Sequence, residues 1–118
     1  MIKLEFELKK SGYFSINIEE KKYKSIELIS NFDWTSERVA EDLEWTQRCI
    51  EGTFEEDGDD DFYVGFEGSP GIIYVKNNDR AYVEDAYDDE IEDYLVLSLE
   101  ELKSVLQQMY DFLVSIGK

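Results

Sequence analysis

The periodicity of the apolar residues limits the possible folds more than any other feature of this sequence. Between Ile2 and Leu8 apolar residues alternate with charged ones, the period of two that turns one face of a β-strand toward a core. The alternation returns between Phe14 and Ile18, after a Lys-Lys-Ser-Gly turn, so we expect the first two strands to form a hairpin. A third short run, Ile26 to Ile29, is ambiguous, so the chain starts either with the hairpin alone or with three strands.

Two later segments have helical periodicity instead. Their apolar stripes are Val39, Leu43, Thr46 and Ile50 in the first, and Leu99, Leu102, Leu106, Met109, Leu113 and Ile116 in the second. The first helix is predicted to begin at Thr35 or Ser36 and to end near Ile50, because Gly52 follows it and glycine favours a helix C-terminus. The second is predicted to begin at Ser98, which together with Glu101 has the spacing of a capping box.

The chain between the two helices predicts an antiparallel meander. We expect an exposed loop first and then four short strands: Phe62 to Phe66, Ile72 to Lys76, Ala81 to Val83 or as far as Tyr87, and Tyr94 to Leu97. Turn sequences at 69–71 and 77–79 separate the first three of these strands. The sequence therefore predicts an α+β fold in one domain, residues 1–118, with an N-terminal hairpin, a meander, a central helix and a C-terminal helix that covers the sheet.

The charge of −17 is concentrated in the middle of the chain. Residues 51–101 carry eighteen acids against two bases, a net charge of −16, whereas the flanking segments are nearly neutral. Nucleic-acid binders have the opposite sign, because Lys and Arg contact the phosphates, and an acidic surface is repelled by anionic lipid. We therefore expect no direct nucleic-acid or membrane binding. The lone Cys49 and the lack of a leader or spanning segment indicate the cytoplasm.

Common catalytic and cofactor signatures are missing. The chain has no histidine, the usual general base and metal ligand. We interpret Cys49 as a buried or half-buried apolar residue of the first helix, and the glycines at 65, 68 and 71 match no nucleotide-binding fingerprint. The many carboxylates leave a glycosidase-like pair open, but runs such as Asp59 to Asp61 must face water, where a carboxyl pKa is not raised.

Asp57, Asp59 and Asp61 have the first three ligand spacings of a calcium-binding EF-hand loop. The sixth and twelfth positions hold Phe62 and Gly68 instead of the required Gly and Glu. We therefore predict no metal site, no cofactor, no catalytic residue and no small-molecule substrate.

The acidity itself indicates binding, because a charge this dense goes beyond what solubility needs and destabilises the compact state. Six aromatic residues interleave with the acids: Phe62, Tyr63, Tyr74, Tyr82, Tyr87 and Tyr94. Tyrosine suits an interface, since it buries a large ring and keeps its hydroxyl hydrogen-bonded; alternatively, alternate rings belong to the core. Trp45 falls off the apolar stripe of the first helix, where it can meet a partner, or pack beneath the following loop or against Trp34.

In its small α+β layout, its histidine-free acidity, and the segment Asp61-Phe-Tyr-Val-Gly-Phe-Glu-Gly-Ser-Pro-Gly-Ile-Ile-Tyr-Val followed by acids and a Leu-rich helix, the chain resembles immunity proteins of bacterial contact-dependent growth inhibition and related polymorphic toxin systems. The resemblance implies a cytoplasmic antitoxin that forms a heterodimer with one cognate toxin domain, often a basic nuclease. It transfers no functional residue by position.

Our hypothesis assigns the partner contact to two groups of residues. Ten acids supply a negative electrostatic field: Asp57, Asp59, Asp60, Asp61, Glu84, Asp85, Asp88, Asp89, Glu92 and Asp93. Three aromatic residues anchor the contact: Tyr63, Tyr87 and Trp45. Two alternatives remain. A nucleic-acid mimic of the anti-restriction type would also bind basic proteins, but several of them, and a small acidic hydrolase would show turnover that one carboxylate substitution abolishes.

Overall fold

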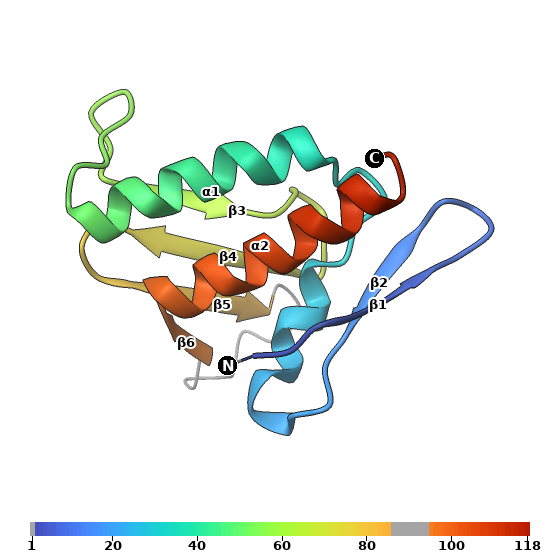
Figure 1. The fold of residues 1–118 in the computed structure, drawn as a ribbon. Coiled ribbons are helices and arrows are strands. Elements are labelled where there is room, and N and C mark those ends of the chain that lie inside the picture. The colour runs from blue at the N-terminus through green and yellow to red at the C-terminus, as the bar shows by residue number, and fades with distance from the viewer. Residues whose placement is uncertain (1, 86–94) are drawn as a thin grey trace.

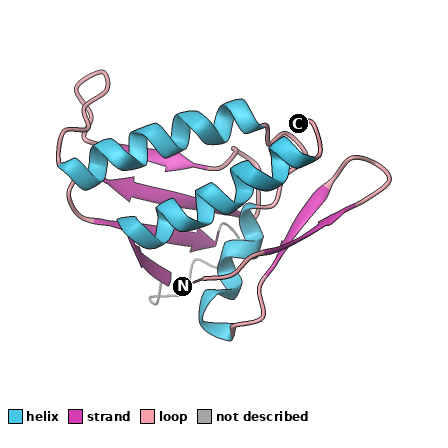
Figure 2. Ribbon diagram, in the orientation of Figure 1, coloured by secondary structure: helices cyan, strands magenta, loops and turns pink. Residues whose placement is uncertain are grey.

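The computed structural model describes residues 2–85 and 95–118 of the chain. In chain order its elements are β1 Glu5–Leu8, β2 Phe14–Asn17, the 3-10 helix η1 Lys21–Ile29, α1 Ser36–Glu51, β3 Asp61–Val64, β4 Gly71–Lys76, β5 Arg80–Asp85, β6 Leu95–Ser98 and α2 Leu99–Ser115. Strands β1 and β2 form an antiparallel hairpin, and β3 to β6 form a four-stranded antiparallel meander in sequence order. Figure 2 shows these two groups of strands as separate sheets. The predicted α+β class, with a hairpin, a meander and a closing helix, is confirmed.

Helices α1 and α2 run antiparallel across one face of the meander (Figure 1). The start of α1 meets the end of the chain, where the Ser36 N–H donates to the Lys118 carbonyl at 3.1 Å. The predicted ends are also confirmed: Gly52 is left-handed at the α1 C-terminus, and Ser98 and Glu101 form both bonds of the capping box. In the described ranges no helix is long and apolar enough to cross a membrane.

The buried stripe of α1 differs from the one expected. Val39 and Thr46 are buried as predicted, but the other buried positions are Asp42 and Cys49. Both sets have helical spacing, because a residue three or four positions on lies on the same face. Hydrophobicity favours Leu43 and Ile50, each four residues after a buried position, as the next buried residues. Asp42 is not expected there, because a carboxylate is rarely buried.

The ambiguous run at 26–29 is not a third strand next to the hairpin, because it ends the 3-10 helix η1. This helix has three residues per turn, so Ile26 and Ile29 stand on the same face, and both are fully buried. The helix packs directly on the start of β4. A Cβ placed on Gly71 would lie 2.5 Å from the Leu28 Cβ, so only glycine permits this approach.

The first strand is shorter than its alternation predicts. Ile2 and Leu4 are buried, but the strand ladder begins at Glu5. In place of a neighbouring strand, the side-chain amide of Gln108 on α2 accepts from the Leu4 N–H at 2.9 Å and donates to the Ile2 carbonyl at 2.8 Å. One glutamine thus holds the start of the chain against the C-terminal helix.

The meander has one inner and one outer face. The inner face meets the helices and supplies buried core residues: Phe62, Val64, Ile73, Val75, Ala81, Val83 and Leu97. The alternate residues of the same strands point the other way. Of the neighbours Tyr82 and Val83, Val83 faces inward, and in the described ranges no helix packs on the outer face. This outer face includes the exposed side chains of Tyr63 and Val96.

Candidate functional site

The acidic turn, defined as residues 55–60, joins α1 to β3. Residues 55–61 are predicted to form an exposed loop; residues 55–60 are all exposed, whereas Asp61 is half-buried and begins β3. The acidic turn is also ordered: Glu56 and Asp59 exchange both backbone hydrogen bonds at 2.9 Å, and Asp57 and Gly58 between them have φ values of 51° and 85°. Two consecutive positive φ angles characterise a type I′ hairpin turn, for which Asp-Gly is a preferred sequence. Five carboxylates are thus presented on a tight turn that projects beyond the end of α1 (Figure 1).

Neighbouring elements brace both ends of the acidic turn. The Arg48 guanidinium donates to the Glu55 carbonyl at 3.1 Å, lies 3.8 Å from a Glu56 carboxylate oxygen, and sits 5.3 Å from the centre of the Phe54 ring. At the other end, the Asn77 N–H donates to the Asp60 carbonyl at 2.8 Å. These contacts fix where the turn points, although the exposed ion pair itself stabilises the fold little.

The tyrosine row, defined as Tyr63, Tyr74 and Tyr82, crosses the outer face of the meander. The register places Tyr63 opposite Tyr74 and Tyr74 opposite Tyr82, with Val96 next in line on β6. The ring centres are 5.1 Å and 6.3 Å apart, within the range of favourable aromatic pairs. Tyr63 is 50% exposed. The row forms a continuous, partly apolar surface of the kind that interface centres use.

Asp61 joins the acidic turn to the tyrosine row. It begins β3 on the same face as Tyr63, and the Tyr74 hydroxyl donates to its Oδ2 at 2.7 Å. This hydrogen bond stabilises the neutral phenol beside a carboxylate and raises the pKa of Tyr74 to about 12, with nearby Tyr63 and Asp60 adding to the shift. The Tyr74 hydroxyl is therefore a permanent donor that orients Asp61 at neutral pH.

Basic residues border the same surface. Lys76 lies opposite Asp61 in the register, Arg80 begins β5 on the same face, and both are exposed. Glu84, opposite Ile72, lies further along that face. Among the described residues, the acidic turn presents five carboxylates at one end of the sheet, whereas the face of the sheet carries both signs.

Trp45 lies on α1 beside the loop that follows the helix. It is partly buried against the core, with its ring 5.6 Å from Phe54 and 5.3 Å from Phe62. Of the two packing positions considered for it, the one beneath this loop is observed, whereas Trp34 instead packs against Phe66. Trp45 supports the base of the acidic turn from within, and its role as a partner contact stays a prediction.

The structure brings together only part of the predicted contact set. The residues Asp57, Asp59, Asp60, Asp61 and Tyr63 lie side by side on the acidic turn and β3, and Glu84 lies across the sheet on β5. Asp85 ends β5, where it pairs with Gly71 in the register. The others lie outside the described residues: Tyr87, Asp88, Asp89, Glu92 and Asp93.

Tyr74 and Tyr82 were not among the predicted anchors, although their sequence positions carried the signal. Both alternate with buried residues in β4 and β5, so strand periodicity alone turns them outward. Their alignment with Tyr63 depends on the register between strands, which the turn lengths determine.

Asp42 is the carboxylate with the most strongly altered chemistry. Its side chain is 2% exposed, its Oδ2 accepts no hydrogen bond, and the nearest cation is Arg38, with Nε 3.8 Å away. Burial raises the pKa of Asp42 to about 7, partly offset by Arg38 and reinforced by Glu41. A raised pKa is also a mark of catalytic acids; because the largest cause of this shift is burial, we relate it here to the stability of the fold.

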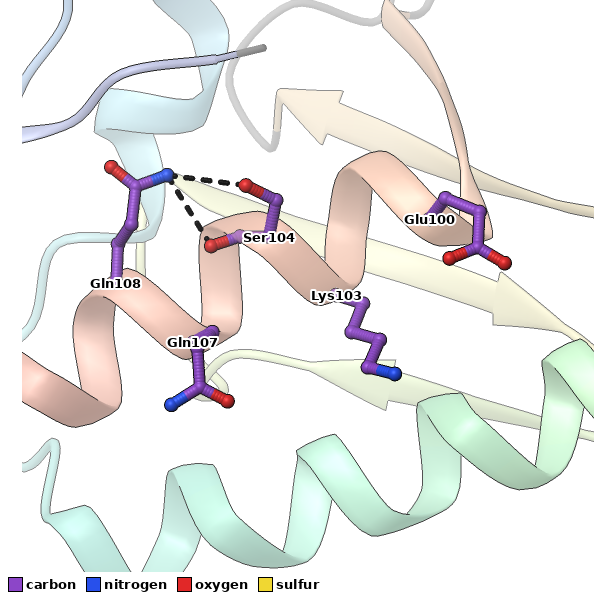
Figure 3. A pocket seen from close by; sticks show the side chains of 5 residues that line it. All are labelled: Glu100, Lys103, Ser104, Gln107 and Gln108. Atoms are coloured by element: carbon purple, nitrogen blue, oxygen red, sulfur yellow. Dashed lines mark hydrogen bonds between the residues drawn. The ribbon is translucent and has the colours of Figure 1, made fainter.

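The largest described hollow lies along α2 and has a volume of about 440 Å³ (Figure 3). Its lining is Glu100, Lys103, Ser104, Gln107 and Gln108. Gln108 donates to the Ser104 carbonyl and hydroxyl at 3.3 and 3.4 Å, and Lys103 donates to Gln47 of α1 at 2.7 Å. The bond from Lys103 joins α2 to α1, whereas the bonds between Gln108 and Ser104 lie within α2. Among the described residues no group of three or more Cys, Asp or Glu side chains is placed to hold a metal ion.

Comparison with protein-family models, with curated proteins and with solved structures found no match. The function proposed below therefore depends on the surface itself.

Proposed function

We propose that this chain is a cytoplasmic immunity protein that binds and neutralises one cognate toxin domain, a basic nuclease, and is not itself an enzyme. The observation that carries the proposal is the juxtaposition of the acidic turn with the tyrosine row on a sheet face that no described helix covers. The resemblance noted from the sequence supports the same assignment.

The two parts of this surface supply different parts of the binding free energy. Flat tyrosine rings give a large contact area at low conformational cost and are typical of interface hot spots. The exposed carboxylates of the acidic turn attract a positive partner and raise its association rate by roughly 10- to 1000-fold at low salt. Rapid capture suits an antitoxin, since free toxin is harmful.

A nuclease is the partner class that fits this surface best. It must present a positive groove to the phosphates of its substrate, and an acidic turn that projects from the body of the inhibitor can enter such a groove. Its carboxylates then take the place of phosphates while the tyrosine row meets the wall of the groove. Inhibition follows because substrate and inhibitor compete for one surface.

Growth rescue tests the proposal. The chain is co-expressed in bacteria with the toxin domain encoded by the neighbouring upstream reading frame, and we expect it to restore growth. Charge reversal of the acidic turn at Asp57, Asp59 and Asp60 should abolish rescue, whereas the matched reversal of the exposed residues Glu19, Glu41 and Glu44 should not.

Two outcomes would contradict the proposal. If the wild-type chain gives no rescue, or if reversal of the acidic turn has no more effect than the matched control, the toxin is not captured through this surface. Rescue from an unrelated DNA-binding toxin as well would indicate a nucleic-acid mimic, because a mimic inhibits several basic partners.

A further inference from the structure

The carboxylate of Asp61 is held in a fixed position beside the exposed ring of Tyr63. The two residues are two positions apart on one face of β3, and the Tyr74 hydroxyl occupies one Asp61 oxygen at 2.7 Å. A carboxylate has about four acceptor positions, so Asp61 can accept further hydrogen bonds. It therefore presents a pre-oriented acceptor next to an aromatic face.

The ring of Tyr63 is open to a partner. In the described sheet β3 is an edge strand, paired only with β4, and the Tyr63 side chain is 50% exposed. Its one aromatic neighbour in the row, Tyr74, lies 5.1 Å away at a 47° tilt. A planar cation can therefore stack on the ring of Tyr63 from the edge of the sheet.

The protein already contains this type of contact at a half-buried position. The Arg38 guanidinium lies 4.7 Å from the centre of the Phe66 ring and donates to the Gly65 carbonyl at 3.0 Å. An aromatic face and an oxygen acceptor side by side thus hold a guanidinium just after the end of β3. Tyr63 and Asp61 place the same two kinds of group side by side on the outer face of β3.

Lysine behaves differently at the same place. Lys76 stands opposite Asp61 in the register, yet among the ion pairs of the described residues none joins the two. An ammonium is a strongly hydrated point charge, whereas a guanidinium is planar, less hydrated and able to stack and donate hydrogen bonds together. The position next to Asp61 therefore favours the guanidinium.

We infer that the outer sheet face selects arginine over lysine in its basic partner, with a guanidinium stacked on Tyr63 and hydrogen-bonded to Asp61. The inference rests on the proposed function for the existence of a basic partner, and it names the side chain by which that partner is recognised.

Two peptides of equal charge test the inference on the intact protein. Capped hexaarginine and hexalysine are titrated by calorimetry at physiological salt, and we expect hexaarginine to bind about three- to tenfold more tightly, the range of a partly exposed cation–π contact plus a charge-assisted hydrogen bond. The substitutions Y63A and D61N should each bring the ratio of the two dissociation constants close to one. Both residues lie outside the core, and circular dichroism verifies that the variants fold.

Matched controls separate the site from general acidity and aromaticity. Tyr13→Ala removes another partly exposed tyrosine, and Glu44→Gln removes another exposed carboxylate; neither should change the ratio. Equal dissociation constants for the two peptides, or a preference for arginine that survives both Y63A and D61N, would overturn the inference. Growth rescue without an arginine preference refutes this inference alone, whereas an arginine preference without rescue refutes the proposed function and leaves the site standing.

Discussion

Replacing Asp42 with asparagine should stabilise the protein at neutral and alkaline pH. Asp42 is buried on α1 with an unbonded Oδ2, and its pKa is raised from 3.8 to about 7. The folded protein therefore keeps a proton on Asp42 that the unfolded chain releases between about pH 4 and pH 7. Across that window the folded state binds more protons than the unfolded state, so stability falls as pH rises.

The magnitude follows from the shift. About three pKa units at 1.36 kcal/mol each give an upper limit of about 4 kcal/mol for the cost of ionised Asp42 above pH 7. The amide of D42N removes this cost but leaves a buried polar group without a full set of partners, a loss of about 1 to 3 kcal/mol. We therefore expect a net gain of roughly 2 kcal/mol at about pH 8 and, because only the loss from the buried amide remains there, a net loss of about 1 to 3 kcal/mol at about pH 4.

Urea unfolding followed by tryptophan fluorescence, from about pH 4 to pH 8, measures both the gain and its pH dependence. The matched control is Glu44→Gln, which removes an exposed charge from the same helix and should not change the slope of stability against pH between pH 4 and 7. If D42N and wild type showed parallel pH profiles, or if D42N were less stable at pH 8, the assignment of a raised pKa to a buried Asp42 would be wrong.

Three further substitutions test other parts of the structure. Gly71→Ala should destabilise the fold by about 1 to 3 kcal/mol, because the new methyl group would lie 2.5 Å from the Leu28 Cβ. Urea unfolding measures the loss of stability, and an unchanged midpoint would contradict the packing of η1 on β4. Ser98→Ala should cost about 1 kcal/mol by the same assay, since it removes the capping box of α2, and a neutral result would mean that the cap is not formed in solution. Asp61→Asn should lower the pKa of Tyr74 from about 12 toward its ordinary 10; a titration of tyrosinate absorbance should then show one more phenol ionising near pH 10 than in wild type, and an identical titration would exclude the hydrogen bond.

The sequence predicted the elements whose signals are local. Helix α2 is predicted by the capping box of Ser98 and Glu101 and by the apolar stripe that follows it. The end of α1 is predicted by Gly52. The 3-10 helix was missed because the isoleucines at 26 and 29 are compatible with several periods over so short a run.

Features that depend on distant packing were not predictable in this way. Asp42 is buried because of how α1 packs, although its residue type indicates exposure. The tyrosine row depends on how three strands are aligned with one another. The hydrogen bond between Leu4 and Gln108 joins residues from opposite ends of the chain. The order of the acidic turn, by contrast, was encoded in Asp57-Gly58, whose dipeptide signals a hairpin turn.

The salt dependence of toxin binding tests the central claim most directly. The dissociation constant of the purified toxin domain is measured at several salt concentrations for wild type, for the charge-reversed acidic turn and for Y63A. The proposed surface predicts that wild-type binding weakens as the salt concentration rises. Reversal of the acidic turn should weaken binding and flatten the salt dependence, whereas Y63A should weaken binding and leave the salt dependence unchanged. An unchanged dissociation constant and an unchanged salt dependence in the charge-reversed variant would contradict the claim that this acidic surface binds the partner.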